Sequence, residues 1–502
     1  MRFIRMRSLR LAMLAAGLSI AGASSALAQL ADRFEGTLNV VWGDPRHGAA
    51  GGEMRFSVSL ANGTTYALHL SPAQQSGAVF NFGKPVVVHG QLTAGLHGAQ
   101  EISAQSIEAA HGAGQETARH APTRRVLYLL LKFQGDSQEP HDPSFYLAMT
   151  NPKQPNAGLS IPATINGFFS KTSWNNLQWR ADVSQWMTLP HPKTFYANCG
   201  WDTSCADINA ISNDGFALAV SAGIDLSRYD NINFVLNNDL DCCAWGGGTS
   251  FNGRSYGATW EPPWGQETGT YAHEFGHSIG LPHSGWTYYS YDSPWDIMSD
   301  RTASSFTQCS TYFSDNDNAN RAVYCTEPGD GYIAAHKDYL GWIPLANQVV
   351  VNGPMTVRVK LEANAAPLGT GIKMVKICLS GASCTGSSAH YLTVEARIGG
   401  KLYENGLTGD GVIIQDFKAN RGAIGGTCYF NTQSGFVVPI DATPGDWDGV
   451  NCDSNGATWP DYALGNAQFT PGQTYTDNTL HVSVQVKRKK GQNYVISVTR
   501  TQ

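Results

Sequence analysis

The chain has 502 residues, a formal net charge of −6, 42% hydrophobic residues and 15% charged residues. This length suits roughly three domains of about 150 residues, and this composition excludes a largely disordered chain. The slightly acidic balance, without a basic patch, predicts no nucleic-acid partner. The many glycines (54) and aromatics (11%) favour a loop-rich, β-rich protein.

The first 28 residues have the pattern of a secretory signal peptide. Arginines up to Arg10 precede an apolar run, Leu11 to Ala23, and the small residues Ala26-Leu27-Ala28. A membrane anchor is the alternative, but the run is shorter than the about 18 residues that a spanning helix needs. We therefore expect cleavage near Ala28, no membrane span, and a secreted or periplasmic protein.

Residues 29–108 are predicted to form a small β-domain. Apolar and polar residues alternate from Met54 to Leu60 and from Tyr66 to Leu70, on either side of Asn62-Gly63. This pattern is typical of a hairpin with a tight turn. Val86–Val88 predicts a further strand, so a small barrel or sandwich is expected. The domain is either a propeptide or a permanent binding module.

Residues 109–124 read as a linker, because they are rich in Gly, Ala, His, Thr and Pro and have no apolar period. The linker is closed by the basic pair Arg124-Arg125. If it is exposed, this pair is a candidate processing site; an ordinary interdomain linker is the alternative.

Residues 125–345 are predicted as a mixed α/β unit. Val126–Phe133 and Asn231–Leu236 are dense apolar runs typical of buried strands. Gly246–Gly248 is expected to break the chain, and Ser255–Trp260 is expected to be an edge strand that could hold an extended peptide by strand addition. Thr268–Ile279 is predicted to be a helix.

Residues 346–502 return to a β pattern, and a C-terminal β-sandwich is expected. The fold class of the whole chain is thus predicted as α+β. The strand candidates are Met355–Leu361, Ile372–Leu379, Tyr391–Arg397, Gly411–Phe417, His481–Val486 and Tyr494–Thr499.

All ten cysteines follow residue 198, and an even number behind an export signal predicts disulfides. The expected local pairs are Cys309–Cys325, Cys378–Cys384 and Cys428–Cys452. Because Cys242 and Cys243 are adjacent, a bond between them would be strained, and pairing with Cys199 and Cys205 is expected instead. A thiolate zinc site is the alternative, but the spacing fits no usual pattern.

Residues 273–283 read HEFGHSIGLPH and carry the chemistry. On a helix, His273 and His277 share one face, and Glu274 can accept a proton from water without being a ligand. Gly280 can take positive φ and reverse the chain, which brings back His283 as a third ligand. Three protein ligands with an open fourth position are typical of a catalytic zinc site.

A second element follows this motif. Ser293–Ser299 reads SPWDIMS and resembles the turn of metzincins in which a methionine lies beneath the metal; the resemblance implies that Met298 forms an apolar floor beneath the three imidazoles. A lone methionine is otherwise usually a core residue. A long histidine motif followed by a methionine turn is the signature of metzincins.

The chain therefore resembles the metzincin metalloproteases, most closely the gametolysin-like branch, over about residues 125–345. The resemblance implies a twisted sheet above an active-site helix, one zinc ion on His273, His277 and His283, and Glu274 as general base. Asp300 stands where some members carry a tyrosine, and no cysteine precedes Cys199, so neither a tyrosine ligand nor a cysteine switch is expected. If residues 29–124 are inhibitory, a carboxylate or histidine must cap the metal.

The expected function is an exported zinc endopeptidase acting on extracellular proteins or peptides. The alternatives are a non-catalytic adhesin or matrix-binding protein, and a zinc amidase acting on cell-wall material. Ser314–Asn318 resembles a calcium loop but lacks the glycine and the final glutamate, so a solvated turn is preferred to a Ca²⁺ site. The other histidines, His336 among them, lack ligand spacing and are expected to be structural or surface residues.

Overall fold

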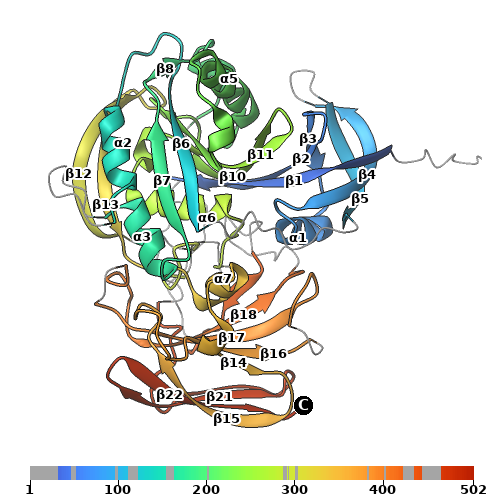
Figure 1. The fold of residues 1–502 in the computed structure, drawn as a ribbon, viewed down its shortest axis with the longest axis vertical. Coiled ribbons are helices and arrows are strands. Elements are labelled where there is room, and N and C mark those ends of the chain that lie inside the picture. Colours follow the sequence, from blue (N-terminus) through green and yellow to red (C-terminus); the bar gives the residue numbers. More distant parts are fainter. Residues whose placement is uncertain are drawn as a thin grey trace, which may run out of the picture.

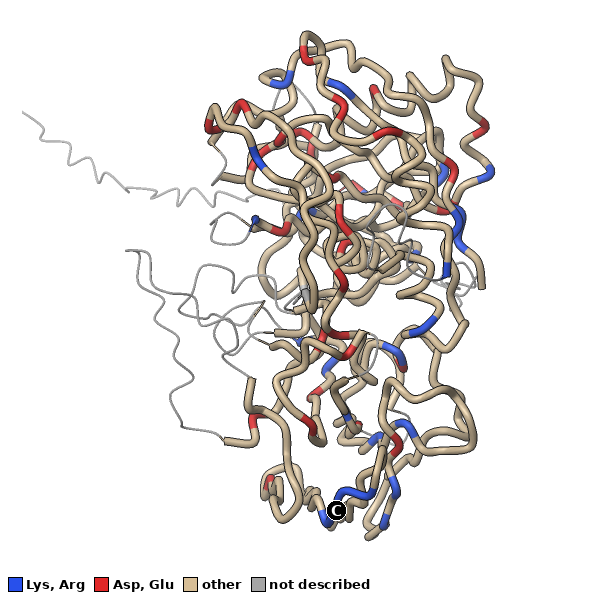
Figure 2. The backbone as a smooth tube through the Cα atoms, turned by 90° about the vertical axis from the view of Figure 1, so that its left-hand side faces the viewer, with Lys and Arg blue, Asp and Glu red and all other residues tan. Residues whose placement is uncertain are grey.

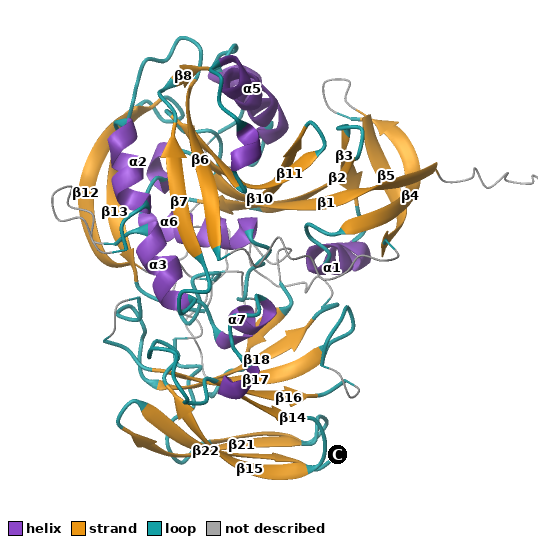
Figure 3. Ribbon diagram, viewed as in Figure 1, coloured by secondary structure: helices purple, strands orange, loops and turns teal. Residues whose placement is uncertain are grey.

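A computed structural model gives the fold (Figure 1). Strands account for 44% of the described residues and helices for 17%, and one sheet closes into a five-stranded barrel (Figure 3). The chain is therefore mostly β, and the predicted α+β class is wrong, because sheets supply most of the regular structure and the helices are few and short. The structure describes residues 32–46, 52–95, 100–110, 122–153, 163–200, 203–285, 291, 293–299, 303–380, 384–400, 403–421, 435–443 and 465–502.

The barrel is N-terminal. Its strands follow the order β2-β3-β5-β4-β1, and β1 also pairs with β2, which closes the ring. The predicted hairpin at Asn62-Gly63 is confirmed, with Gly63 at a φ of 89°. The elements are β1 (Asp32–Pro45), β2 (Glu53–Leu60), β3 (Thr65–His69), α1 (Pro72–Phe80), β4 (Pro85–Ala94) and β5 (Gln100–Ala109).

The central part is a five-stranded sheet of order β10-β11-β9-β6-β7. Its strands are parallel except β10, which pairs antiparallel with β11. The second half of β1 pairs with β10, so the barrel and the central sheet are hydrogen-bonded to each other. The strands are β6 (Thr123–Lys132), β7 (Gln178–Val183), β8 (Met187–Thr188), β9 (Asn231–Leu236), β10 (Cys243–Phe251) and β11 (Arg254–Glu261).

Two expectations about this sheet are wrong. Gly246–Gly248 does not break the chain but lies inside β10. Ser255–Trp260 lies in β11, which is paired on both sides, so it is not an edge strand. The misreading has a physical cause: glycine usually weakens a strand, but here its missing side chain lets other groups approach β10.

Helices cover both faces of the central sheet (Figure 1). Val126, Tyr128 and Leu130 of β6 face one core, and the alternate residues of the strand face the other, as the two-residue period of a strand requires. The first core includes α2 (Pro143–Thr150), α3 (Ile165–Thr172) and α6 (Thr268–Ser278), and the second includes α5 (Ile208–Ser221). Small further helices are α4 (Lys193–Tyr196) and α7 (Ala334–Tyr339).

A long hairpin and two C-terminal sheets complete the structure. The hairpin joins β12 (Ala303–Ser314) to β13 (Ala319–Pro328). The two C-terminal sheets enclose one apolar core, in which Val375 and Val394 meet Val484 and Ile496. Their strands are β14 (Gln348–Val351), β15 (Met355–Glu362), β16 (Met374–Cys378), β17 (His390–Arg397), β18 (Gly411–Lys418), β19 (Val437–Pro439), β20 (Thr474–Asp477), β21 (Val482–Lys490) and β22 (Asn493–Arg500).

The disulfide predictions have mixed outcomes. The pairs Cys309–Cys325 and Cys378–Cys384 are confirmed. The other prediction is wrong, because Cys199 pairs with Cys205 and the adjacent Cys242 and Cys243 pair with each other. Cys428–Cys452 lies outside the described residues. Several disulfides are compatible with an extracellular protein.

The region between barrel and central sheet corrects another expectation. Arg124 is only 8% exposed in β6, and its Nε donates to Asn231 Oδ1 at 2.8 Å. Arg124-Arg125 is therefore not an exposed basic pair. The predicted signal peptide lies outside the described residues. Among the residues that the structure describes, no helix is both long and apolar enough to cross a membrane.

Charged side chains are scattered over the molecule apart from one cluster. β21 ends in four consecutive exposed cations, Lys487 to Lys490, at the end of the C-terminal sheets (Figure 2). This end lies opposite the central sheet (Figure 1), so the cluster does not flank the histidines of α6.

Candidate metal centre

Helix α6 presents the predicted ligands because of how it begins and ends. Glu267 caps its start by accepting hydrogen bonds from the backbone of Gly269 and Thr270. At its end, Gly280 has a φ of 97°. Its N–H bonds the His277 carbonyl, and the next N–H bonds the Gly276 carbonyl. This is a Schellman end, and it turns the chain back towards the helix as the sequence predicted.

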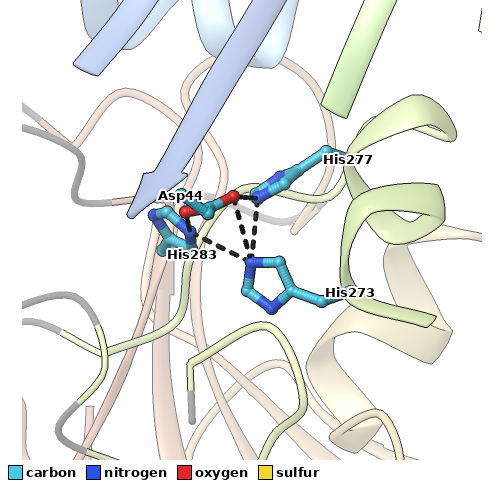
Figure 4. Close-up of side chains that lie close together, drawn as sticks. All are labelled: Asp44, His273, His277 and His283. Atoms are coloured by element: carbon cyan, nitrogen blue, oxygen red, sulfur yellow. Dashed lines mark hydrogen bonds and ion pairs between the residues drawn. The ribbon is translucent and has the colours of Figure 1, made fainter. Parts of the chain in front are cut away.

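The turn brings three imidazoles together (Figure 4). His277 Nε2 lies 3.1 Å from His273 Nε2, and His273 Nε2 lies 3.3 Å from His283 Nε2. All three side chains are buried. The structure thus brings His273, His277 and His283 together, the three residues that the motif singled out.

A fourth ligand atom comes from a residue that the sequence reading missed. Asp44, at the end of β1, places Oδ1 2.9 Å from His283 Nε2. Its Oδ2 lies 3.1 Å from His277 Nε2 and 3.3 Å from His273 Nε2. Four ligands at zinc bond lengths of about 2.0–2.1 Å in a tetrahedron lie about 3.3 Å apart, which the four residues closely match.

Hydrogen bonds on the outer ring nitrogens explain why the inner nitrogens can bind a cation. His277 Nδ1 lies 2.7 Å from the Leu281 carbonyl, and His273 Nδ1 contacts the Ile297 carbonyl. A carbonyl only accepts hydrogen bonds, so each Nδ1 carries the proton and each Nε2 a lone pair. Lone pairs facing one another and a carboxylate repel, and a metal ion between them would relieve this repulsion.

The charge states favour metal binding as well. Burial lowers the pKa of His277 to about 3, which keeps this ring neutral and able to act as a ligand. Burial alone would raise the pKa of Asp44. Positive charge on the imidazoles of His283, His273 and His277 outweighs burial and holds that pKa well below its ordinary value; a cation bound between neutral rings would supply the same attraction.

Glu274, the predicted general base, is fully buried between α6 and β10. A Cβ added to Gly246 of β10 would lie 2.6 Å from Glu274 Oε2. The glycine in β10 therefore leaves space for this carboxylate. Glu274 follows His273 directly in the chain, and its carboxylate lies against Gly246 of β10, the residue that pairs with Trp42 of β1.

Met298, which was predicted to form an apolar floor beneath the three imidazoles, packs against Gly276 of α6. It is fully buried, and a Cβ on Gly276 would overlap its sulfur. The Met298 carbonyl accepts a hydrogen bond of 3.3 Å from the backbone of Ser284, next to His283. The turn that contains Met298 thus contacts both the helix and the chain that carries the third histidine.

The C-terminal part supports this turn through buried charges. Arg397 of β17 donates to the Trp295 carbonyl and forms two hydrogen bonds, of 2.9 and 3.0 Å, with Glu404. Burial would lower the pKa of Arg397, but Glu404 and Glu395 outweigh it and raise that pKa. His336 lies 2.7 Å from Asp296 in the same turn. We call Arg397, Glu404, Asp296 and His336 the turn-support network.

A tyrosine also reaches the centre, from an unexpected position. The Tyr291 hydroxyl donates to Asp44 Oδ1, and its ring centroid lies 5.0 Å from that of His283. No tyrosine ligand was expected from the sequence, because Asp300 stands at the position where some metzincins carry a tyrosine. Asp300 itself lies outside the described residues. The sequence offered no signal for Tyr291 or Asp44, because neither belongs to the motif.

The loop with calcium-like spacing holds no second metal cluster of this kind. Lys193 Nζ contacts the side-chain oxygens of Asp315 and Asn316, and Asp317 pairs with Arg321. Cations of the chain thus lie on these oxygens.

Comparison with known proteins adds no assignment to this centre. No family model and no curated protein matches the chain. What the structure shows is a buried group, Asp44, His273, His277 and His283, that could hold a metal ion.

Proposed function

We propose that the chain is an exported zinc-dependent endopeptidase. The observation that carries the proposal is the convergence of His273, His277 and His283, and the buried Glu274 follows His273 directly in the chain. Three neutral imidazoles and an adjacent carboxylate are the donor set of zinc hydrolases. The resemblance of the HExxHxxGxxH motif and Met298 to metzincin proteases favours peptide bonds as the substrate.

The residues divide the chemistry among them. His273, His277 and His283 would hold the zinc ion, whose Lewis acidity would lower the pKa of water from 15.7 towards about 7 and would polarise a carbonyl. Glu274 accepts the proton of the attacking water at its carboxylate and passes it to the leaving amine. Residues 243–247 of β10 pair with β1, so an extended peptide would hydrogen-bond to this part of β10 only in place of β1.

Export is part of the proposal. The N-terminal pattern that ends at Ala28 supports a signal peptide, and the disulfides suit an oxidising compartment. Mass spectrometry of the protein recovered from culture medium and periplasm should find a chain that begins near Gln29.

Peptide hydrolysis with and without a chelator tests the proposal. The assay uses an Asp44→Ala background, because Asp44 lies on the three histidines. Glu274→Ala should retain one zinc ion per chain but lose about 10²–10⁴ in rate, whereas His277→Ala should lose both zinc and activity. The exposed Glu35→Gln is the control. Stoichiometric zinc without peptide hydrolysis would favour the adhesin or amidase alternatives.

A further inference from the structure

Strand β1 belongs to two structures at once. It closes the barrel by pairing with β4 over Asp32–Thr37 and with β2 over Gly36–Gly43, and its last residues, Val41–Pro45, pair antiparallel with β10. In the central sheet, β10 is otherwise paired only with β11. β1 therefore takes the place at which an extended peptide would add a strand beside the metal centre. The paired residues are Val41 with Gly247, Trp42 with Gly246, Gly43 with Trp245, Asp44 with Ala244 and Pro45 with Cys243.

The contact is closely fitted at two neighbouring residues. Trp42 stacks on His277, with ring centroids 4.6 Å apart and an interplanar angle of 9°. Gly43 lies beneath Trp245, where a Cβ would come within 2.6 Å of the indole. The guanidinium carbon of Arg55 also lies 4.2 Å from the centroid of the Trp245 ring. The indole therefore has little freedom to move away from Gly43.

We propose that Asp44 is a fourth metal ligand and that β1 keeps the site latent in the intact chain. The proposal rests on the metal site proposed above. Asp44 fills the coordination position that a water or substrate carbonyl needs, and β1 occupies the backbone of β10 at the same time. An extended peptide can therefore bind only after β1 leaves.

The linkage within one chain makes this block effective. A tethered group acts at a high effective concentration, on the order of millimolar for short flexible connections. Asp44 competes with substrate at this concentration as long as the barrel remains attached. The barrel is thus an inhibitory domain, and this resolves the two alternatives that the sequence left open for residues 29–108.

The block also indicates how a substrate would lie. A peptide that replaces β1 would run antiparallel to β10, because β1 does so. Its reacting carbonyl would lie at the level of Gly43 and Asp44, next to the three imidazoles.

Binding of acetohydroxamate to the zinc-loaded full chain tests the proposal without any peptidase assay. This small anion needs an open position on the metal. Asp44→Ala should bind it at least about tenfold more tightly than wild type, because apparent affinity scales with the fraction of open molecules. The control is Glu35→Gln, on the same strand, whose partner is the exposed Arg33 at 2.8 Å.

A second variant opens the site while Asp44 is kept. Gly43→Leu cannot fit beneath Trp245 and should raise acetohydroxamate affinity in the same way. In the Co²⁺-loaded protein, the visible d–d absorption should change for Asp44→Ala and for Gly43→Leu but not for Glu35→Gln.

Each outcome has a defined meaning. Unchanged affinity and absorption in the two β1 variants would overturn the proposal, provided that circular dichroism shows a folded chain. If both rise but no variant cleaves peptides, Asp44 remains a metal ligand and the endopeptidase proposal fails instead. If peptide hydrolysis also rises with Asp44→Ala, both proposals are supported.

Discussion

The two flanking β regions reach the same metal centre by different physical means. The N-terminal barrel contributes one carboxylate, Asp44, at the end of a strand. The C-terminal region contributes Arg397, whose guanidinium is buried and bonded to both Glu404 and the Trp295 carbonyl. The first contact touches the ligands themselves, and the second holds the turn beneath them.

The two contacts also differ in the surroundings of the carboxylate that is left when each contact is broken. When β1 leaves, Asp44 returns to water and the metal can take another ligand. If Arg397 leaves, Glu404 is stranded without its partner in a buried place, and an uncompensated buried charge is costly. We infer that the N-terminal contact can be released and that the C-terminal contact is a permanent part of the folded site.

The largest expected effect comes from the turn-support network. Arg397→Met should destabilise the protein by about 3–5 kcal/mol, because it leaves Glu404 buried and unpaired. Urea denaturation measures the free energy of unfolding, and metal analysis measures the zinc content per chain. Both quantities should be lower in this variant. Asp44→Ala, by contrast, should retain zinc and most of the stability, since the three histidines remain.

A double variant serves as the control for this prediction. Arg397→Met combined with Glu404→Leu removes both charges and should recover much of the lost stability, since apolar replacements of buried pairs are often neutral. If the single variant is as stable as wild type, the C-terminal contact is as dispensable as the N-terminal one, and the comparison fails.

The buried His141, in the central part, should make the protein less stable in acid. This loss of stability is independent of the N-terminal and C-terminal contacts. Burial lowers the pKa of His141, which stacks on Phe145, to about 4. The unfolded chain binds a proton below about pH 6.5 and the folded chain does not. Stability from this residue is therefore complete above pH 6.5 and is lost as pH falls to 4, by up to about 3 kcal/mol.

The measurement is the dependence of the unfolding free energy on pH for His141→Phe. This variant should flatten the acid limb between pH 6.5 and 4 and should change nothing at pH 8 beyond a constant offset. An unaltered acid limb would mean that acid acts elsewhere, at one of the two flanking contacts.

The smallest expected effect concerns Tyr291, which donates to Asp44. Tyr291→Phe keeps the ring beside His283 and removes a hydrogen bond to a charged group, worth about 1.5 kcal/mol. Acetohydroxamate affinity should therefore rise by about tenfold at most, and by less than in Asp44→Ala. An affinity equal to that of Asp44→Ala would mean that Tyr291, and not the strand, holds the carboxylate in place.

Much of the fold could be predicted only element by element. The strands of the barrel hairpin and of the C-terminal sheets follow from alternation, which is a local property. The predicted chain break at Gly246–Gly248 is wrong, although glycines usually weaken a strand, because these residues lie inside β10. Here Gly246 makes room for Glu274, and Gly247 for the carbonyl of Val40. The predicted α+β class is wrong because the helices are few and short, whereas sheets supply most of the regular structure.

The sequence by itself indicated that His273, His277 and His283 would converge, and it singled out Glu274 as the candidate base. Helix spacing and the glycine turn act within eleven residues, so local backbone geometry is enough to bring them together. Only the tertiary structure decided the fourth ligand, because Asp44 lies 233 residues before His277. It arrives there through the pairing of β1 with β10, and no local pattern encodes which strand a free edge will accept.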